Sequence, residues 1–127
     1  MTPSPDSLIR AGAVFNAAFF VFHIAFWRLF DWKRQLPLLT PINRAVMQVL
    51  NLCLMCAFLV FAWVSWFHTG EMLATPLGHA LLAWIAIFWA IRAAEQLVFF
   101  QRTGSSWVFF TIFVIGTLLY AWPLMAV

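Results

Sequence analysis

Charged residues are scarce in this sequence. Acidic residues number four and basic residues seven among 127, so the charged share is 9%, whereas about a quarter of an average soluble domain is charged. The hydrophobic share is 65%. A water-soluble protein of this size cannot hide that much apolar surface, whereas lipid removes the need to hide it. The composition therefore excludes an ordinary soluble domain and indicates a membrane protein.

Motifs that identify a reaction are scarce as well. The chain has two cysteines, and a thiol oxidoreductase of the membrane needs a second pair to pass electrons onward. It also lacks a Gly-rich phosphate loop and a Ser/His/Asp set. A basic stripe and zinc-finger spacing are missing, which argues against a nucleic-acid partner. The sequence thus indicates no catalytic residues, no metal-ligand set and no particular cofactor, and it favours a non-enzymatic role.

Long apolar segments make up most of the chain. Four of them cover residues 8–30, 42–67, 76–100 and 107–127, and each reaches the length of about 20 residues that a helix needs to cross a bilayer. Thr40-Pro41 and Thr75-Pro76 are typical helix starts, because proline at the first position loses only an N–H that has no helical partner. Short links make antiparallel neighbours. We therefore expect one transmembrane domain, 1–127, that forms an all-α, integral membrane four-helix up-down bundle.

The basic residues predict an orientation in the membrane. Five of them belong to the first and third links or the helix ends beside them, against one at the opposite side, Arg10. The excess of basic residues on one side predicts that both termini lie outside the cytoplasm. The string from His23 to Trp32, with Phe26, Trp27 and Phe30, followed by Asn43-Arg44 and by Gln48 and Asn51, resembles small bacterial membrane proteins in general and identifies no family. The bacterial inner membrane is the expected location. The five basic residues of the first and third links and the neighbouring helix ends are Arg28, Lys33, Arg34, Arg44 and Arg102.

Polar residues gather at one depth of the expected bundle. With alternating helix directions, the end of the first helix, the start of the second and the end of the third lie at the same level. Arg44, Gln48 and Asn51 have helical spacing and share one face. A polar face toward lipid is costly, so these faces should meet inside the bundle. The candidate ligand-binding residues are His23, Arg44, Gln48, Asn51, Arg92, Glu95 and Gln96.

Two interpretations of this polar group compete. In the first, the side chains satisfy one another, with local pairs Arg92–Glu95 and Arg28–Asp31, and the amides join helices. In the second, they line a cavity in the cytoplasmic half. Arg44 has no acidic partner nearby in the sequence, and two helix N-termini point to this end, which favours an anion. An anionic lipid or another anionic or amphipathic small molecule would then be the ligand.

These interpretations lead to three hypotheses for the function. The preferred one is a binding or transport module, which at this size would need a homodimer to enclose a pathway. The alternative is an accessory or structural subunit of a larger membrane complex. The third is a haem- or copper-binding redox protein, with His68 and His79 near the outer surface or with Cys53 and Cys56, although ordinary packing explains the cysteines better.

Two further expectations concern aromatic residues and the last segment. Tyr120 is expected in the aromatic belt at the membrane–water interface, and Trp89, inside a span, is expected to pack or to face lipid. Segment 107–127 has few polar groups. It is therefore expected to be the segment that most faces lipid or an oligomeric partner.

Overall fold

The computed structural model describes residues 2–127, which are largely helical and contain no strand. Four helices are long and apolar enough to cross a membrane, as expected of an integral membrane protein. The prediction of an all-α four-helix bundle is confirmed. The elements are α1 (Pro5–Ile24), α2 (Phe26–Leu29), α3 (Trp32–Gln35), the 3-10 turn η1 (Leu36–Leu38), α4 (Pro41–Phe67), α5 (Thr69–Ala74), α6 (Pro76–Phe99) and α7 (Gly104–Ala126).

Each of the four long helices begins at a hydroxyl side chain that caps it. The cap oxygen accepts a hydrogen bond from a backbone N–H three residues further on, which satisfies one of the free donors of the first turn. Proline follows the cap directly in α1, α4 and α6. The helix starts therefore follow from local sequence. The caps are Ser4, Thr40, Thr75 and Thr103.

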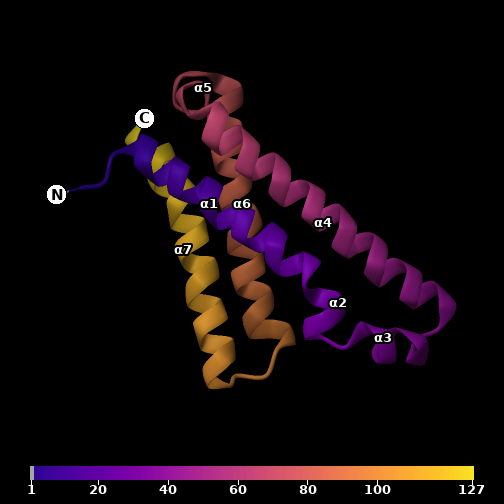
Figure 1. Cartoon of the computed structure of the whole chain (residues 1–127). Helices are drawn as coiled ribbons and strands as arrows, with labels where there is room; N and C mark the ends of the chain where they lie inside the picture. The colour runs from indigo at the N-terminus through magenta and orange to yellow at the C-terminus, as the bar shows by residue number, and fades with distance from the viewer. Residues whose placement is uncertain (1) are drawn as a thin grey trace.

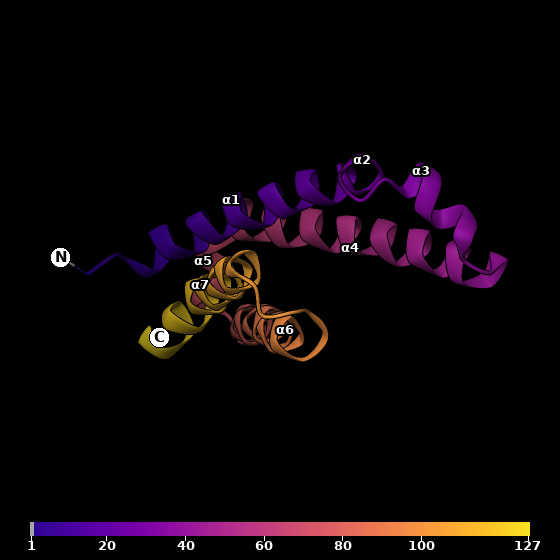
Figure 2. The same cartoon turned by 90° about the horizontal axis from the view of Figure 1, so that it is seen from below.

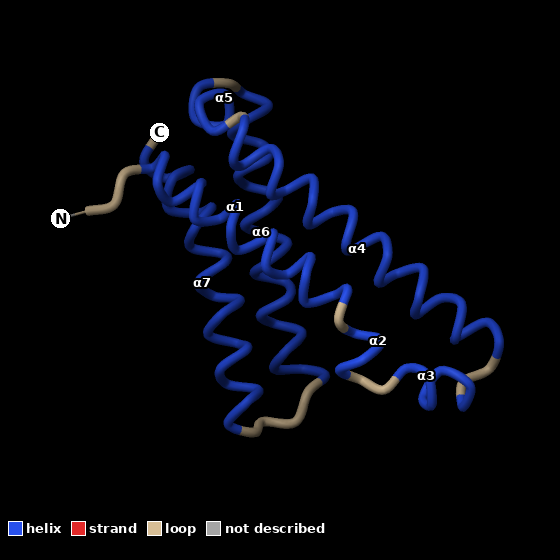
Figure 3. Tube along the Cα trace, viewed as in Figure 1, coloured by secondary structure: helices blue, strands red, loops and turns tan. Residues whose placement is uncertain are grey.

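The first apolar segment is divided, in contrast to the single helix expected over 8–30. The long helix α1 ends at Ile24, and after Ala25 the short α2 follows. Asp31 then adopts a left-handed conformation with φ of 51°, which Asp tolerates better than most residues. The turn brings Trp32 back against Phe26 and Trp27, with ring centroids 5.9 and 5.0 Å away. The break is visible as short loops between α1, α2 and α3 (Figure 3).

The four long helices are arranged as two crossed antiparallel pairs. Helix α1 lies beside α4, and α6 lies beside α7. Figure 2 shows the first pair as one layer and the second pair as another layer beneath it. Helix α1 also packs on α7, and α5 packs on α1 and α6. The pairs meet at the end that holds both termini and α5, and α4 slants away from α6 toward the end that holds α3 (Figure 1).

Four buried aromatic rings, one from each long helix, pack together where the pairs cross. The Trp89 ring stacks between Phe58 and Phe113, with centroids 5.5 and 5.8 Å away and 14° between the planes in both cases. Phe19 lies 4.8 Å from Trp89. We call these four residues the central stack. It separates a tightly packed end of the protein, beside α5 and the termini, from an open end beside α2 and α3.

Helix α7 is more central than its composition suggests. It packs against both α6 and α1 and buries Phe113, Gly116 and Tyr120. Helix α4, in contrast, buries only Asn51, Phe58 and Ser65 of its 27 residues. The expectation that segment 107–127 faces lipid most is therefore wrong. Its small residue Gly116 admits the Phe15 ring, which is why a nearly apolar helix packs in the interior.

Candidate functional site

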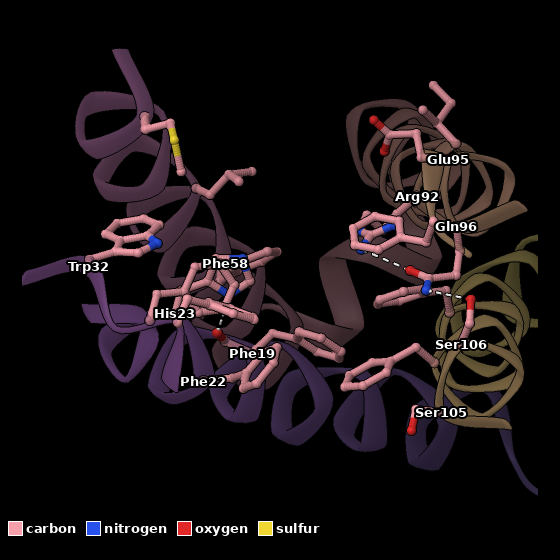
Figure 4. A pocket seen from close by; sticks show the side chains of 18 of the residues that line it. Phe19, Phe22, His23, Trp32, Phe58, Arg92, Glu95, Gln96, Ser105 and Ser106 are labelled. Atoms are coloured by element: carbon pink, nitrogen blue, oxygen red, sulfur yellow. Dashed lines mark hydrogen bonds between the residues drawn. The ribbon is translucent and has the colours of Figure 1, made fainter. Parts of the chain in front are cut away.

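A cavity of about 1390 Å³ opens between the two helix pairs at the open end. Its inner boundary is the central stack, and α2, α3 and the α6–α7 link surround its outer part. Most of its wall is aromatic or aliphatic, whereas its polar groups are few. Figure 4 shows Arg92, Glu95, Gln96 and Ser106 on one side of this space and His23, Phe58 and Trp32 on the other. A space of this size can hold a drug-sized molecule.

Arg92 is the main charged group of the α6–α7 wall. Its Nη2 donates to Gln96 Oε1 at 3.1 Å, and Gln96 Nε2 donates to Ser106 Oγ at 2.9 Å. The guanidinium carbon lies 4.3 Å from the ring centroid of Phe113 and 5.2 Å from that of Phe100, distances typical of cation–π contacts. These contacts hold the guanidinium in one place, and its Nη1 has no hydrogen-bond acceptor in residues 2–127.

The local ion pairs predicted from the sequence do not form within residues 2–127. Arg92 pairs with the neutral Gln96, and Glu95 lines the cavity half-buried without an ion pair to Arg92. Asp31 lies 3.9 Å from Arg34 rather than pairing with Arg28. The spacing of three residues allowed both predicted pairs, but the Phe113 ring and Gln96 direct the Arg92 guanidinium elsewhere. The charge of Arg92 thus has no direct acidic partner.

His23 is the polar residue of the opposite wall. Its Nδ1 lies 2.8 Å from the Phe19 carbonyl oxygen, one turn earlier in α1. Its ring stacks on Phe26, with centroids 4.2 Å apart. Asn51 of α4 donates from Nδ2 to the His23 carbonyl at 3.1 Å. Asn51 therefore joins α1 to α4 beside the cavity, and His23 lines the cavity itself.

Arg44 and Gln48 lie away from the cavity wall. Arg44 Nε donates to the Leu36 carbonyl at 3.0 Å, and its Nη2 donates to the Pro37 and Leu39 carbonyls, both at 3.4 Å. Arg44 thereby attaches η1 and the residue that follows it to the start of α4. Gln48 Nε2 donates to the Arg44 carbonyl at 3.3 Å. Of the seven candidate residues, the structure brings His23, Arg92, Glu95 and Gln96 together around the cavity.

Three residues of the site were not among the candidates. Trp89 lines the cavity and is 1% exposed, and its indole N–H has no acceptor in the described chain. Ser106 accepts the hydrogen bond from Gln96, and Phe113 contacts Arg92. The sequence carried one signal for Ser106, because a short link places the start of α7 at the level of Gln96. It carried no signal that distinguishes Trp89 or Phe113 from ordinary apolar packing.

A second polar cluster lies at the packed end. Asn16 Nδ2 donates to the Gly12 carbonyl at 2.9 Å and to Tyr120 Oη at 2.8 Å, and Ser65 Oγ lies 2.7 Å from Tyr120 Oη. All three side chains are fully buried. Tyr120 thus connects α1, α4 and α7 in the interior. The prediction that it belongs to the aromatic belt at the membrane–water interface is therefore wrong. The lack of a side chain at Gly12 creates the space for it.

The residues of the redox hypothesis are dispersed. Cys53 and Cys56 are exposed on α4. His68 Nδ1 lies 2.9 Å from Glu71 Oε1, and His79 Nε2 lies 2.7 Å from the Leu73 carbonyl oxygen. Residues 2–127 contain no group of three or more His, Cys, Asp or Glu side chains arranged to hold a metal ion.

No family model matches this chain, and no curated protein and no solved structure is significantly similar to it.

Proposed function

We propose that this protein is a non-enzymatic binding module that takes up one amphipathic, anionic small molecule between its two helix pairs. The observation that carries the proposal is the cavity of about 1390 Å³, which combines a mostly apolar wall with a half-buried arginine, Arg92. An apolar wall favours the hydrophobic part of a ligand by the hydrophobic effect and by close contact. The arginine favours an anionic group.

Arg92 supports a binding role more than a purely structural one. A charged side chain within a membrane span is expensive and generally has a partner. Arg92 satisfies only part of its hydrogen-bonding capacity through Gln96, and no acidic side chain forms an ion pair with it in residues 2–127. A ligand anion would supply the missing acceptor and the missing charge. Asn51 and Arg44, in contrast, bond to backbone carbonyls and support the structural interpretation for their part of the bundle.

We further propose that the chain acts as a single transmembrane domain in a bacterial inner membrane, with the cavity in the cytoplasmic half. The basic residues Arg28, Lys33, Arg34 and Arg102 lie near the open end in the chain's up-down arrangement, which by the positive-inside rule favours the cytoplasm. The packed end closes the cavity toward the other side. If the protein transports its ligand, this conformation is the one that is open to the cytoplasmic half.

Native mass spectrometry of the gently extracted protein tests the proposal. Leu54 of α4 lines the cavity, whereas Leu52 of the same helix is exposed and does not. Leu54→Trp should fill part of the cavity, and Leu52→Trp is the matched control. We expect an additional mass of a lipid-sized molecule on the wild type and on Leu52→Trp, and its loss from Leu54→Trp.

Other outcomes of this experiment contradict the proposal. An additional mass that persists equally in both variants would place the ligand outside the cavity. A second polypeptide that departs in Leu54→Trp would favour the accessory-subunit hypothesis, because the cavity would then hold a helix of a larger complex. A bare chain in all three samples, before and after addition of hexadecanoate or hexadecanol, would leave the polar groups as helix contacts only.

A further inference from the structure

The polar part of the cavity is built to leave one edge of a guanidinium free. Arg92 Nη2 is occupied by Gln96, and Gln96 is itself fixed by Ser106. The rings of Phe113 and Phe100 lie close to the guanidinium. These contacts hold the guanidinium in place while its buried Nη1 stays without an acceptor in residues 2–127, and a donor that is already held in place lowers the entropy cost of binding.

A second free donor lies one helical turn away. Trp89 precedes Arg92 by three residues on α6, so the two side chains share a face. Both line the cavity. The Trp89 ring cannot turn freely, because Phe58 and Phe113 stack against it. Its Nε1, like Arg92 Nη1, is buried without an acceptor in residues 2–127. An indole N–H usually finds a partner when it is buried, so this position requires an acceptor.

The charges around the two donors disfavour a group with two negative charges relative to a group with one. Arg92 is the only Arg or Lys among the residues that line the described cavity, and Glu95 lines it on the same helix. A group with two negative charges would be repelled by Glu95 and would exceed the charge of Arg92. A carboxylate has one charge and two acceptor oxygens, which matches one guanidinium and one indole N–H.

The remaining wall determines the chemical character of the rest of the ligand. Beyond the two donors, most of the lining residues are aromatic or aliphatic, such as Phe22, Phe26, Leu39, Met47 and Phe109. We infer that the ligand is a long-chain carboxylate, whose headgroup accepts hydrogen bonds from Trp89 Nε1 and Arg92 Nη1 and whose chain lies between the helix pairs. This inference rests on the proposed function and specifies the ligand class of the same cavity.

Three probes with the same chain test the headgroup. Hexadecanoate, hexadecanol and hexadecyl phosphate are added at alkaline pH to the protein in nanodiscs, and binding is measured by native mass spectrometry over a concentration series. We expect hexadecanoate to bind about tenfold more tightly than hexadecanol, the order expected for hydrogen bonds to a charged group. Hexadecyl phosphate, as a dianion, should bind less tightly than hexadecanoate.

Variants of Trp89 and Arg92 test whether these two donors cause the preference for hexadecanoate over hexadecanol. Trp89→Phe keeps an aromatic ring and removes the N–H, and it should reduce the preference for hexadecanoate over hexadecanol several-fold. Arg92→Gln should abolish this preference. Trp84→Phe is the matched control on the same helix, because Trp84 is 68% exposed and does not line the cavity. A thermal unfolding curve for each variant shows that it is folded, and hexadecanol binding shows that its cavity is intact.

The outcomes separate this inference from the proposed function. Equal binding of hexadecanoate and hexadecanol that Leu54→Trp prevents would overturn the carboxylate assignment and keep the binding module. Tighter binding of hexadecyl phosphate would assign a phosphate headgroup and also overturn it. An unchanged preference in Trp89→Phe would remove Trp89 from the headgroup site and contradict the two-donor arrangement. Binding of all three probes that Leu54→Trp leaves unchanged would overturn the proposed function itself.

Discussion

The polar side chains at the two ends of the bundle differ in how they are hydrogen-bonded. At the packed end, Asn16 and Ser65 both bond to the Tyr120 hydroxyl, which connects three helices; the three side chains are fully buried, and among their polar atoms Asn16 Oδ1 lacks a partner in residues 2–127. At the open end, His23, Glu95 and Arg92 line a shared cavity, and neither Arg92 Nη1 nor Trp89 Nε1 has a hydrogen-bond acceptor in residues 2–127. Polar groups that satisfy one another hold helices together. Polar groups left with free capacity beside a cavity are available to a ligand.

Small residues reinforce this difference between the ends. A Cβ at Gly78 would collide with the Glu71 carbonyl oxygen and Met72 Cα, and a Cβ at Gly12 would lie 2.6 Å from the Tyr120 ring. Backbones and rings approach closely there because these side chains are absent. At the open end the Gly104 position has nothing within 4 Å. The helices are therefore closely packed at the packed end, whereas the open end leaves space between the two helix pairs.

The largest effect should come from Gly78→Ala at the packed end. Its new Cβ would meet the backbone of α5, which cannot move aside as a flexible side chain does, so we expect a loss of about 2 kcal/mol in the free energy of unfolding. Titration with a denaturing detergent, followed by circular dichroism, measures it. Gly70→Ala is the control, because nothing lies within 4 Å of that Cβ, and it should change stability by less than about 0.5 kcal/mol. Similar effects of both variants would contradict the close α5–α6 contact.

Tyr120→Phe should have the next largest effect. It removes the hydroxyl that bonds Asn16 and Ser65 and leaves their side chains short of partners, so we expect a loss of about 1 kcal/mol. The same detergent titration measures it. Thr111→Val is the control, since the Thr111 hydroxyl bonds only within its own helix to the Trp107 carbonyl. A stability of Tyr120→Phe equal to that of Thr111→Val would show that the cluster does not hold the packed end together.

Arg92→Met should act in the opposite direction. It removes a half-buried charge that forms no ion pair in residues 2–127, so we expect the free energy of unfolding without ligand to rise by about 0.5 kcal/mol. Hexadecanoate should then stabilise the wild type but not the variant, because a ligand stabilises the state that it binds. Thermal unfolding with and without hexadecanoate measures both effects, and Arg102→Met, at an exposed arginine, is the control. A large loss of stability in Arg92→Met would mean that Arg92 is structural.

Asn51→Leu should have the smallest effect. The variant loses the hydrogen bond to the His23 carbonyl and a longer one to Met55 Sδ, but it also removes a buried amide oxygen that has no donor in residues 2–127. These changes nearly cancel, so we expect a change below about 0.3 kcal/mol. Asn16→Leu, at the packed end, likewise removes an amide oxygen without a donor in residues 2–127, but it also leaves the buried Tyr120 hydroxyl without the hydrogen bond from Asn16, so it should cost more in the same titration. Equal effects of the two variants would remove the difference between the ends.

The candidate site was only partly predictable from the sequence. Helical spacing correctly placed Arg92, Glu95 and Gln96 within one turn, and the alternating helix directions brought His23 to the same cavity. The same reasoning could not foresee that Arg44 bonds to the carbonyls of η1, because those carbonyls become available only when the chain turns at Asp31. It also could not identify Trp89, whose sequence neighbourhood is simply apolar.

The sequence by itself determined the number of long apolar helices, the starts of α4 and α6 to within one residue and the membrane class of the protein, because hydrophobic length, hydroxyl caps and proline act within a few residues. Helices α1 and α7 begin three residues before the expected segments. Only the tertiary structure decided which polar groups satisfy one another and which face a cavity. That outcome depends on how the two helix pairs cross, and the crossing is set by distant contacts such as Tyr120 against Gly12 and Phe15 against Gly116. These contacts close one end of the bundle, and the slant of α4 leaves the other end open.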